Sequence, residues 1–176
     1  MSFSVTKEMM AFAVATAQEA GEAIMEIYNT NFDVRSKDDD SPVTEADEKG
    51  ETLIRTRLEN AYPEIPFIGE ESHAAGHKPA VDGGLFWLVD ALDGTKEFIN
   101  KRGEFTVNIA LIDAGVPVFG VVHAPAKKRT FWGGRSHGAF AANGGDEPRE
   151  ITTRTPRPDG LVVVTSRSHW SGEDEY

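Results

Sequence analysis

The stretch Trp87-Leu88-Val89-Asp90-Ala91-Leu92-Asp93-Gly94-Thr95-Lys96-Glu97-Phe98-Ile99 decides the fold and the candidate chemistry. Its apolar beginning, Phe86 to Val89, predicts a buried strand with Asp90 at its carboxyl end. Two carboxylates on one tight turn repel each other unless a cation lies between them, and oxygen ligands at this density suit Mg²⁺. Gly94 and Thr95 then open a helix, whose N-terminal amides form an anion site. The pattern suggests metal-assisted phosphoryl chemistry, although the same residues also suit a plain polar turn.

Composition limits the classes of partner. The 176 residues include 18 basic and 29 acidic ones, a formal net charge of −11, so we expect no nucleic acid polymer as a partner. The absence of cysteine excludes disulfides and thiolate metal sites. The apolar segment 9–17 continues through Ile27 as a helical stripe, which favours a helix over a signal peptide. We therefore expect a cytoplasmic protein without a transmembrane segment, with peripheral association at the inner membrane left open.

Hydrophobic periodicity predicts helices first and hairpins later. The expected helices cover residues 7–28 and the segment from Thr44 to Ala61, with a polar connector at 29–42 and a stop at Pro63. Residues 73–84 read as a loop. The expected strands are 67–68, 86–89, 105–112, 116–122, 129–132, 138–142 and 161–165, with a hairpin turn at 113–115. This order predicts an α+β fold with a largely antiparallel sheet.

Three short acidic segments lie at the ends of these predicted elements, where functional sites are usually built. They are Thr44-Glu45-Ala46-Asp47, Gly69-Glu70-Glu71-Ser72 and Asp90 with Asp93. Each also has a plain structural explanation. Thr44 and Asp47 match a helix capping box, and the two glutamates match a solvated loop pair.

The order of these motifs, from Ser41-Pro42-Val43-Thr44-Glu45-Ala46-Asp47 to Asp93-Gly94-Thr95, resembles the inositol monophosphatase superfamily. The resemblance implies a layered αβαβα sandwich and a Mg²⁺-dependent, lithium-sensitive phosphomonoesterase. The runs 93–99, 103–108 and 166–169 are most similar to the 3′(2′),5′-bisphosphate nucleotidase branch. That branch implies hydrolysis of the 3′-phosphate of adenosine 3′,5′-bisphosphate to give AMP and phosphate. An inositol monophosphatase-type sugar phosphatase is the alternative.

The resemblance also implies roles for individual residues. The implied metal ligands are Glu70, Asp90, the Leu92 carbonyl and Asp93, with Asp90 shared between two Mg²⁺ ions of the two or three in a complete enzyme. The implied contacts to a small phosphorylated substrate are Glu70, Leu92, Asp93, Gly94 and Thr95. Thr95 and Asp47 would be the catalytic pair that activates water for direct in-line hydrolysis.

Two departures from the family pattern affect these expectations. Ala91 stands where the family usually has proline, and each tryptophan lacks the following aspartate of a later Trp-Asp motif. We therefore expect residues 1–176 to form the N-terminal metal-binding domain, with the C-terminal part starting near residue 155 and no complete second domain. Without the later aspartate, we expect the second metal to bind poorly. We also expect the strand at 161–165 to be exposed, which favours a homo-oligomer. An inactive Mg²⁺-binding fragment is a further alternative. A phosphatase with an aspartyl nucleophile is disfavoured, because it needs aspartates two residues apart.

Overall fold

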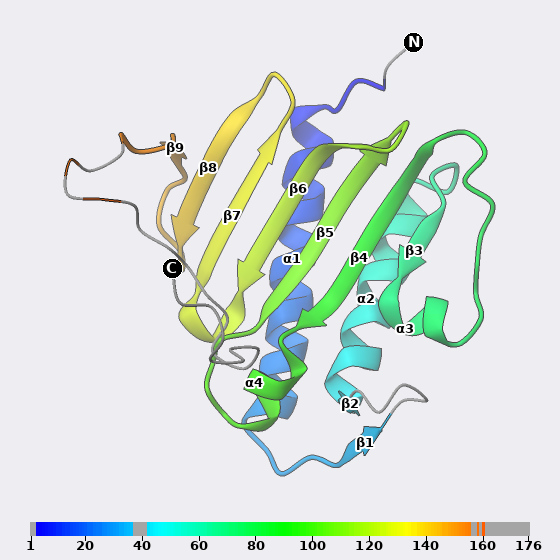
Figure 1. Ribbon diagram of the computed structural model, residues 1–176, viewed down its shortest axis with the longest axis vertical. Coiled ribbons are helices and arrows are strands. Elements are labelled where there is room, and N and C mark those ends of the chain that lie inside the picture. Colours follow the sequence, from blue (N-terminus) through cyan, green and yellow to red (C-terminus); the bar gives the residue numbers. More distant parts are fainter. Residues whose placement is uncertain (1–2, 37–41, 156–157, 159, 161–176) are drawn as a thin grey trace.

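A computed structural model describes residues 3–36, 42–155, 158 and 160 (Figure 1). Its helices are α1 (Lys7–Tyr28), α2 (Glu45–Ala61), α3 (Glu70–Ala74), α4 (Thr95–Ile99) and the 3₁₀ helix η1 (Pro125–Lys127). Its strands are β1 (Val34–Ser36), β2 (Pro42–Thr44), β3 (Phe67–Gly69), β4 (Leu85–Asp93), β5 (Thr106–Asp113), β6 (Val116–Ala124), β7 (Arg129–Gly134), β8 (Gly138–Asn143) and β9 (Arg149–Ile151). None of the helices in the described ranges has the length and apolarity that a membrane span requires.

The two long helices begin at residues that cap their first turns. The Met9 amide donates to Thr6 Oγ1 over 3.1 Å at the start of α1, and Thr44 and Asp47 form a capping box at the start of α2. Such caps satisfy amides that have no partner inside the helix, so the helix starts are set by local sequence. Both helices occupy the ranges that hydrophobic spacing predicts.

Seven strands form the main sheet, in the order β3-β4-β5-β6-β7-β8-β9 (Figure 1). Strands β3 and β4 are parallel, and every other neighbouring pair is antiparallel. The hairpin between β5 and β6 turns at Ala114 (φ 50°) and Gly115 (φ 77°), and positive φ at both central positions is typical of a type I′ turn. The largely antiparallel sheet and the hairpin predicted from the sequence are both confirmed.

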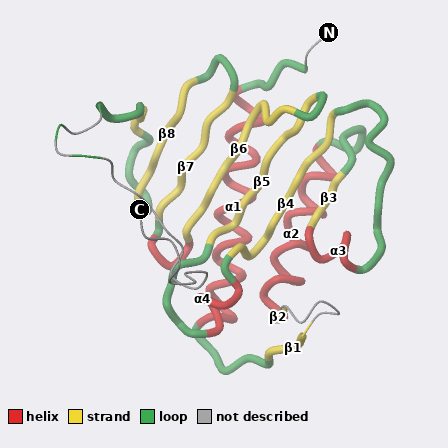
Figure 2. Tube along the Cα trace, in the orientation of Figure 1, coloured by secondary structure: helices red, strands yellow, loops and turns green. Residues whose placement is uncertain are grey.

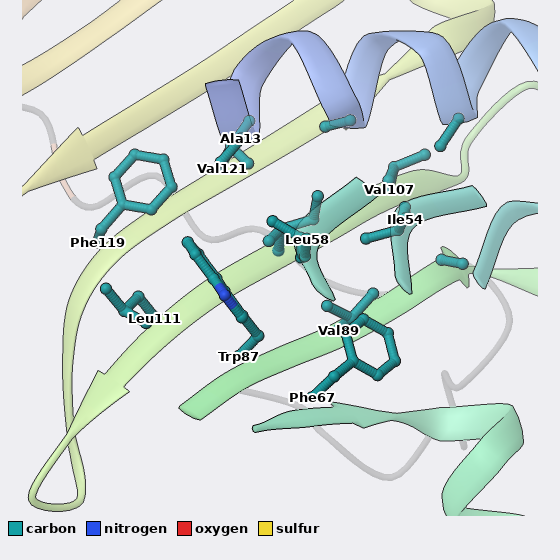
Figure 3. Close-up of a cluster of buried hydrophobic side chains, with 14 of the residues drawn as sticks. Ala13, Ile54, Leu58, Phe67, Trp87, Val89, Val107, Leu111, Phe119 and Val121 are labelled. Atoms are coloured by element: carbon teal, nitrogen blue, oxygen red, sulfur yellow. The ribbon is translucent and has the colours of Figure 1, made fainter. Parts of the chain in front are cut away.

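One face of the sheet is covered by α1 and α2 (Figure 1). The core lies between these helices and the sheet and includes Trp87, Leu58 and Phe119 (Figure 3). In the described part of the chain the opposite face carries no helix layer (Figure 2). There Leu88 and Val122 remain 46% and 42% exposed beside a hollow of about 760 Å³. The structure thus shows one helix layer, one sheet and one uncovered sheet face.

The structure also corrects several predicted boundaries. The strand expected at 86–89 continues as β4 to Asp93, so Asp90 lies within a strand and not at its end. The connector 29–42 includes the ribbon β1–β2, the start of the expected loop belongs to α3, and β9 was not expected. These are short elements with few buried side chains, so their sequences carry little periodic signal. The strand expected at 161–165 and the run 166–169 lie outside the described residues.

Candidate active site

The three acidic segments meet where β3 ends, beside the last residues of β4. These strands run in parallel with Gly69 opposite Val89, so Glu70, the first residue of α3, follows β3 beside Asp90 of β4. The negative charges of Glu70, Asp93 and Asp47 all act on the Asp90 carboxyl group. The structure therefore brings together the four acidic residues that the sequence predicts for the site.

A bulge in β4 sets the directions of the two aspartates. From Trp87 to Ala91 buried and more exposed residues alternate, as expected for a strand with one covered face. Leu92 is buried directly after Ala91, so the alternation slips by one residue. The pairing with β5 shifts register over the same interval, between Asp90 and Asp93. As a result, both aspartates belong to the more exposed positions of the strand, on the side that α1 and α2 leave uncovered.

The charge balance around Asp90 fits a cation. Burial, followed by the charges of Glu70 and Asp93, raises the pKa of Asp90 to about 7. The Leu92 amide donates to Asp90 Oδ1 over 3.1 Å and opposes this shift. Burial is the larger cause of this shift, but the part that comes from Glu70 and Asp93 indicates a site where negative charge is concentrated, and a hard divalent ion would relieve that repulsion.

The side chains do not enclose an ion as they stand. Within the described ranges, no group of three or more histidine, aspartate or glutamate side chains lies close enough together to hold a metal. The available oxygen donors are nevertheless of the right kind: carboxylates of Glu70, Asp90 and Asp93, and the Leu92 carbonyl. Asn108 adds a buried Oδ1 atom that has no hydrogen-bond partner among the described residues. An all-oxygen set of this kind suits Mg²⁺ better than a softer ion.

Asp47 divides its two oxygens between two roles. Oδ2 accepts hydrogen bonds from the Thr44 amide and hydroxyl, both over 2.8 Å, which is the capping interaction expected from the sequence. Oδ1 accepts a hydrogen bond from the Thr95 hydroxyl over 3.2 Å, across 48 residues of sequence. Burial raises the pKa of Asp47, and the hydrogen bonds from Thr44 and Thr95 oppose that rise. The capping role and the contact with Thr95 therefore coexist on one side chain.

Gly94 connects this pair to the end of β4. It has a φ of 95°, and a Cβ atom there would lie 3.0 Å from the Glu104 carbonyl oxygen. Both the left-handed backbone and the close approach favour glycine. The helix predicted after Gly94 is present as α4, which begins at Thr95. Thr95 Oγ1 also lies 3.3 Å from the Leu92 carbonyl oxygen, so its hydroxyl faces both Asp47 and a predicted metal ligand.

Two polar residues near the site were missed by the sequence analysis. Asn108 lies opposite Asp90 on β5, and its Nδ2 donates to Asp93 Oδ2 over 3.2 Å. Glu51 is buried on α2 and accepts hydrogen bonds from the first turn of α3. Glu51 had one detectable signal, because it shares the helical spacing of the buried residues Ile54 and Leu58. A charged residue on such a stripe usually has a buried partner.

Comparison with known proteins identifies the family of this chain. The sequence model of the inositol monophosphatase family matches residues 6–173. The chain belongs to the inositol monophosphatase family. Among curated relatives, the 3′(2′),5′-bisphosphate nucleotidase CysQ of Escherichia coli is 44% identical over 159 residues. The match covers 89% of this chain but 63% of that protein, so the chain spans less than two thirds of the relative's length.

Solved structures with a similar fold include one described as a member of this family. The suhB protein of Bartonella henselae matches with a TM-score of 0.70 at 31% identity, over 78% of this chain and 53% of that one. CysQ from Bacteroides thetaiotaomicron matches with a TM-score of 0.65 at 38% identity, over 83% and 54%. These matches confirm the predicted α+β family fold for the part of the chain they cover.

Proposed function

We propose that this chain carries the metal site and water-activating pair of a Mg²⁺-dependent phosphomonoesterase. The observation that supports this proposal most directly is that two groups of residues lie close together. Carboxylates crowd around Asp90, and the hydrogen-bonded pair Asp47–Thr95 lies at the end of the same strand. Carboxylates that hold a divalent cation, next to a hydroxyl that orients water, suit the hydrolysis of a phosphate ester.

In the proposed reaction each residue has a separate task. Glu70, Asp90, Asp93 and the Leu92 carbonyl hold Mg²⁺. When bound, the ion supplies Lewis-acid stabilisation and lowers the pKa of water. The amides of Gly94 and Thr95 orient the substrate phosphate. Thr95 Oγ1 accepts a hydrogen bond from the attacking water while it donates its own proton to Asp47 Oδ1, so Asp47 fixes the direction of the hydroxyl. The water then attacks the phosphorus in line with the leaving oxygen and passes a proton through Thr95 Oγ1 to Asp47 Oδ1. The ester P–O bond breaks, the leaving oxygen takes a proton from solvent water, and no phosphoenzyme forms.

For the substrate we propose adenosine 3′,5′-bisphosphate, which would lose its 3′-phosphate to give AMP. The support is the identity of 44% to the nucleotidase CysQ of Escherichia coli. Inositol 1-phosphate is the second candidate, because an inositol monophosphatase of Thermotoga maritima matches the structure with a TM-score of 0.68 at 26% identity. The substrate is in either case a small phosphate ester. The short span relative to CysQ makes the activity of the whole protein part of the proposal.

Phosphate release tests this proposal. The chain is assayed with each of the two substrates, in Mg²⁺ and again in excess EDTA, beside CysQ of Escherichia coli as the positive control. We expect release that needs Mg²⁺ and a higher kcat/KM for the bisphosphate. Calorimetric titration with Mg²⁺ alone measures the metal site independently of turnover. A chain that binds no Mg²⁺ at millimolar concentrations would remove the metal assignment, and a preference for inositol 1-phosphate would reverse the choice of substrate.

A further inference from the structure

The Glu51 carboxylate is buried and bonded to the beginning of α3. Its side chain is 4% exposed although glutamate is an acidic residue. Oε2 accepts a hydrogen bond from the Glu71 amide over 2.7 Å, and Oε1 accepts one from the Ser72 amide over 2.9 Å. Arg55, one turn further along α2, lies 3.3 Å from Oε1. A glutamate from a distant helix therefore satisfies the amides that a helix start normally leaves without partners.

Helix α3 relies on this remote cap. Its own N-cap residue, Gly69, provides no side-chain hydrogen bond. A Cβ atom on Gly69 would lie 2.3 Å from Glu51 Cδ, so only glycine leaves room for the carboxylate to reach the amides. Gly69 also ends β3, where it is paired with Val89 of β4. The contact with Glu51 thus fixes the junction between the last residue of β3 and the first turn of α3.

Glu70 lies at this junction, between a glycine in contact with Glu51 and an amide bonded to it. We propose that Glu51 is a positioning residue that holds the Glu70 backbone so that its carboxylate is directed toward Asp90 and the metal. This inference rests on the proposed function, since it takes Glu70 to be a metal ligand. Groups that orient metal ligands without touching the ion commonly change metal affinity by about 10–100-fold when they are removed.

A purely structural role for Glu51 makes a different prediction. Arg55 pairs with Glu51 and also lies over the ring of Phe67 on β3, with Cζ 5.3 Å from the ring centroid. These contacts tie α2 to β3. If Glu51 only anchored that packing, its loss would lower the melting temperature but leave the metal affinity of the folded protein unchanged. Metal affinity and stability must therefore be measured on the same variant.

The decisive variant is Glu51→Gln, which keeps the side-chain volume but replaces one acceptor oxygen with a donor. The matched control is Glu59→Gln, the same change at an exposed position of the same helix. For each protein, calorimetric titration gives the Mg²⁺ dissociation constant, thermal unfolding gives stability, and NMR hydrogen exchange reports the Glu71 and Ser72 amides. We expect Glu51→Gln to raise the dissociation constant about 10–100-fold and to expose both amides to exchange. Glu59→Gln should match the unmutated chain.

The possible results separate the two proposals. If the unmutated chain binds Mg²⁺ and folded Glu51→Gln binds it within twofold as well, the positioning role is wrong and the metal site stands. If the unmutated chain binds no Mg²⁺, the proposed function fails, and the positioning role fails with it.

The unmutated chain provides a test that does not depend on the folding of any variant. Coupling between two sites is reciprocal, so Mg²⁺ held by Glu70 should slow exchange at the Glu71 and Ser72 amides. Amides near the exposed end of α2 should not respond and serve as the internal control. Exchange at Glu71 and Ser72 that is unchanged at saturating Mg²⁺ would overturn the proposal even if Glu51→Gln does not fold.

Discussion

Asp47→Asn tests whether Asp47 acts in catalysis or only caps a helix. The change replaces one carboxylate oxygen with an NH₂ group at almost constant volume. The Thr44 amide can only donate, so the remaining oxygen of the asparagine must stay on that side, where both present hydrogen bonds measure 2.8 Å. The new NH₂ group then faces Thr95 Oγ1, which is now 3.2 Å from Asp47 Oδ1. As a result the Thr95 hydroxyl becomes an acceptor from residue 47, and its own proton turns toward the Leu92 carbonyl oxygen.

The expected magnitudes for stability and turnover are far apart. Complete loss of an N-cap costs about 0.5–2 kcal/mol, and asparagine is itself a good capping residue, so we expect the free energy of unfolding to change by about 1 kcal/mol or less. Burial disfavours the Asp47 carboxylate, as its raised pKa shows, and the neutral asparagine avoids that cost. By contrast, a positioned group that directs proton transfer contributes about 10²–10⁴-fold to the rate.

Urea unfolding and phosphate release on the same preparation give both values. The matched control is Glu48→Gln, because Glu48 follows Asp47 directly but is exposed and pairs with Arg35 over 2.8 Å at the surface. We expect the control to retain the unmutated rate. Turnover of Asp47→Asn within threefold of the unmutated protein would refute the catalytic role. A fall in turnover that merely follows a loss of stability above about 2 kcal/mol would assign Asp47 to capping alone.

Three further predictions follow from the site and the core. Asp90→Asn should abolish Mg²⁺ binding in calorimetry. In EDTA it should raise the melting temperature at pH 8 but not at pH 4. The folded-state pKa of about 7 lies above the ordinary 3.8, so the stability that the protonated carboxyl group provides is lost as pH rises through 7. A lower melting temperature at pH 8 would contradict this sign. Thr95→Ala should lower kcat about 10²-fold while the Mg²⁺ dissociation constant stays within threefold, and loss of metal binding with normal kcat would show that its hydroxyl serves the metal instead. Burial lowers the pKa of His123 below 6.5, so the free energy of unfolding should decrease as pH falls below about 6.5, and His123→Gln should flatten that slope in urea titrations between pH 7 and 5. An unchanged slope would assign the pH dependence to other groups.

The sequence predicts best those parts of the fold that are determined locally. The bounds of α1 and α2 follow from hydrophobic spacing and from neighbouring residues such as Thr44, and the turn at Ala114–Gly115 follows from its own chemistry. The end of β4 was predicted wrongly, because the adjacent buried residues Ala91 and Leu92 interrupt the alternation that identifies a strand. Local rules cannot distinguish a bulge from a strand end, since pairing with β5 decides between them.

Site residues, too, could be predicted from the sequence only where they belong to a short motif along the chain. The acidic residues and Gly94 stand in short motifs, so resemblance to the family was sufficient to predict them as site residues. Glu51 could not be assigned a role, since the amides that it binds lie 20 and 21 residues further along the chain. Asn108 likewise meets Asp93 only after β4 and β5 pair, across 15 residues. Residues that support a site through tertiary contacts carry no motif of their own.

The bulge in β4 makes the length of the Asp90–Asp93 interval more important than the identity of its inner residues. In a regular strand, side chains three positions apart point to opposite faces, and the extra residue of the bulge is what returns Asp93 to the side of Asp90. With the bulge kept, inserting one residue between them would turn Asp93 toward the core under α2, although every predicted ligand would still be present in the sequence. Ala91, in contrast, lies where the ladder is already interrupted, which is a position that also tolerates proline. Sequences can therefore differ at residue 91 and keep the site, but one residue added to the bulged interval would place the two aspartates on opposite faces.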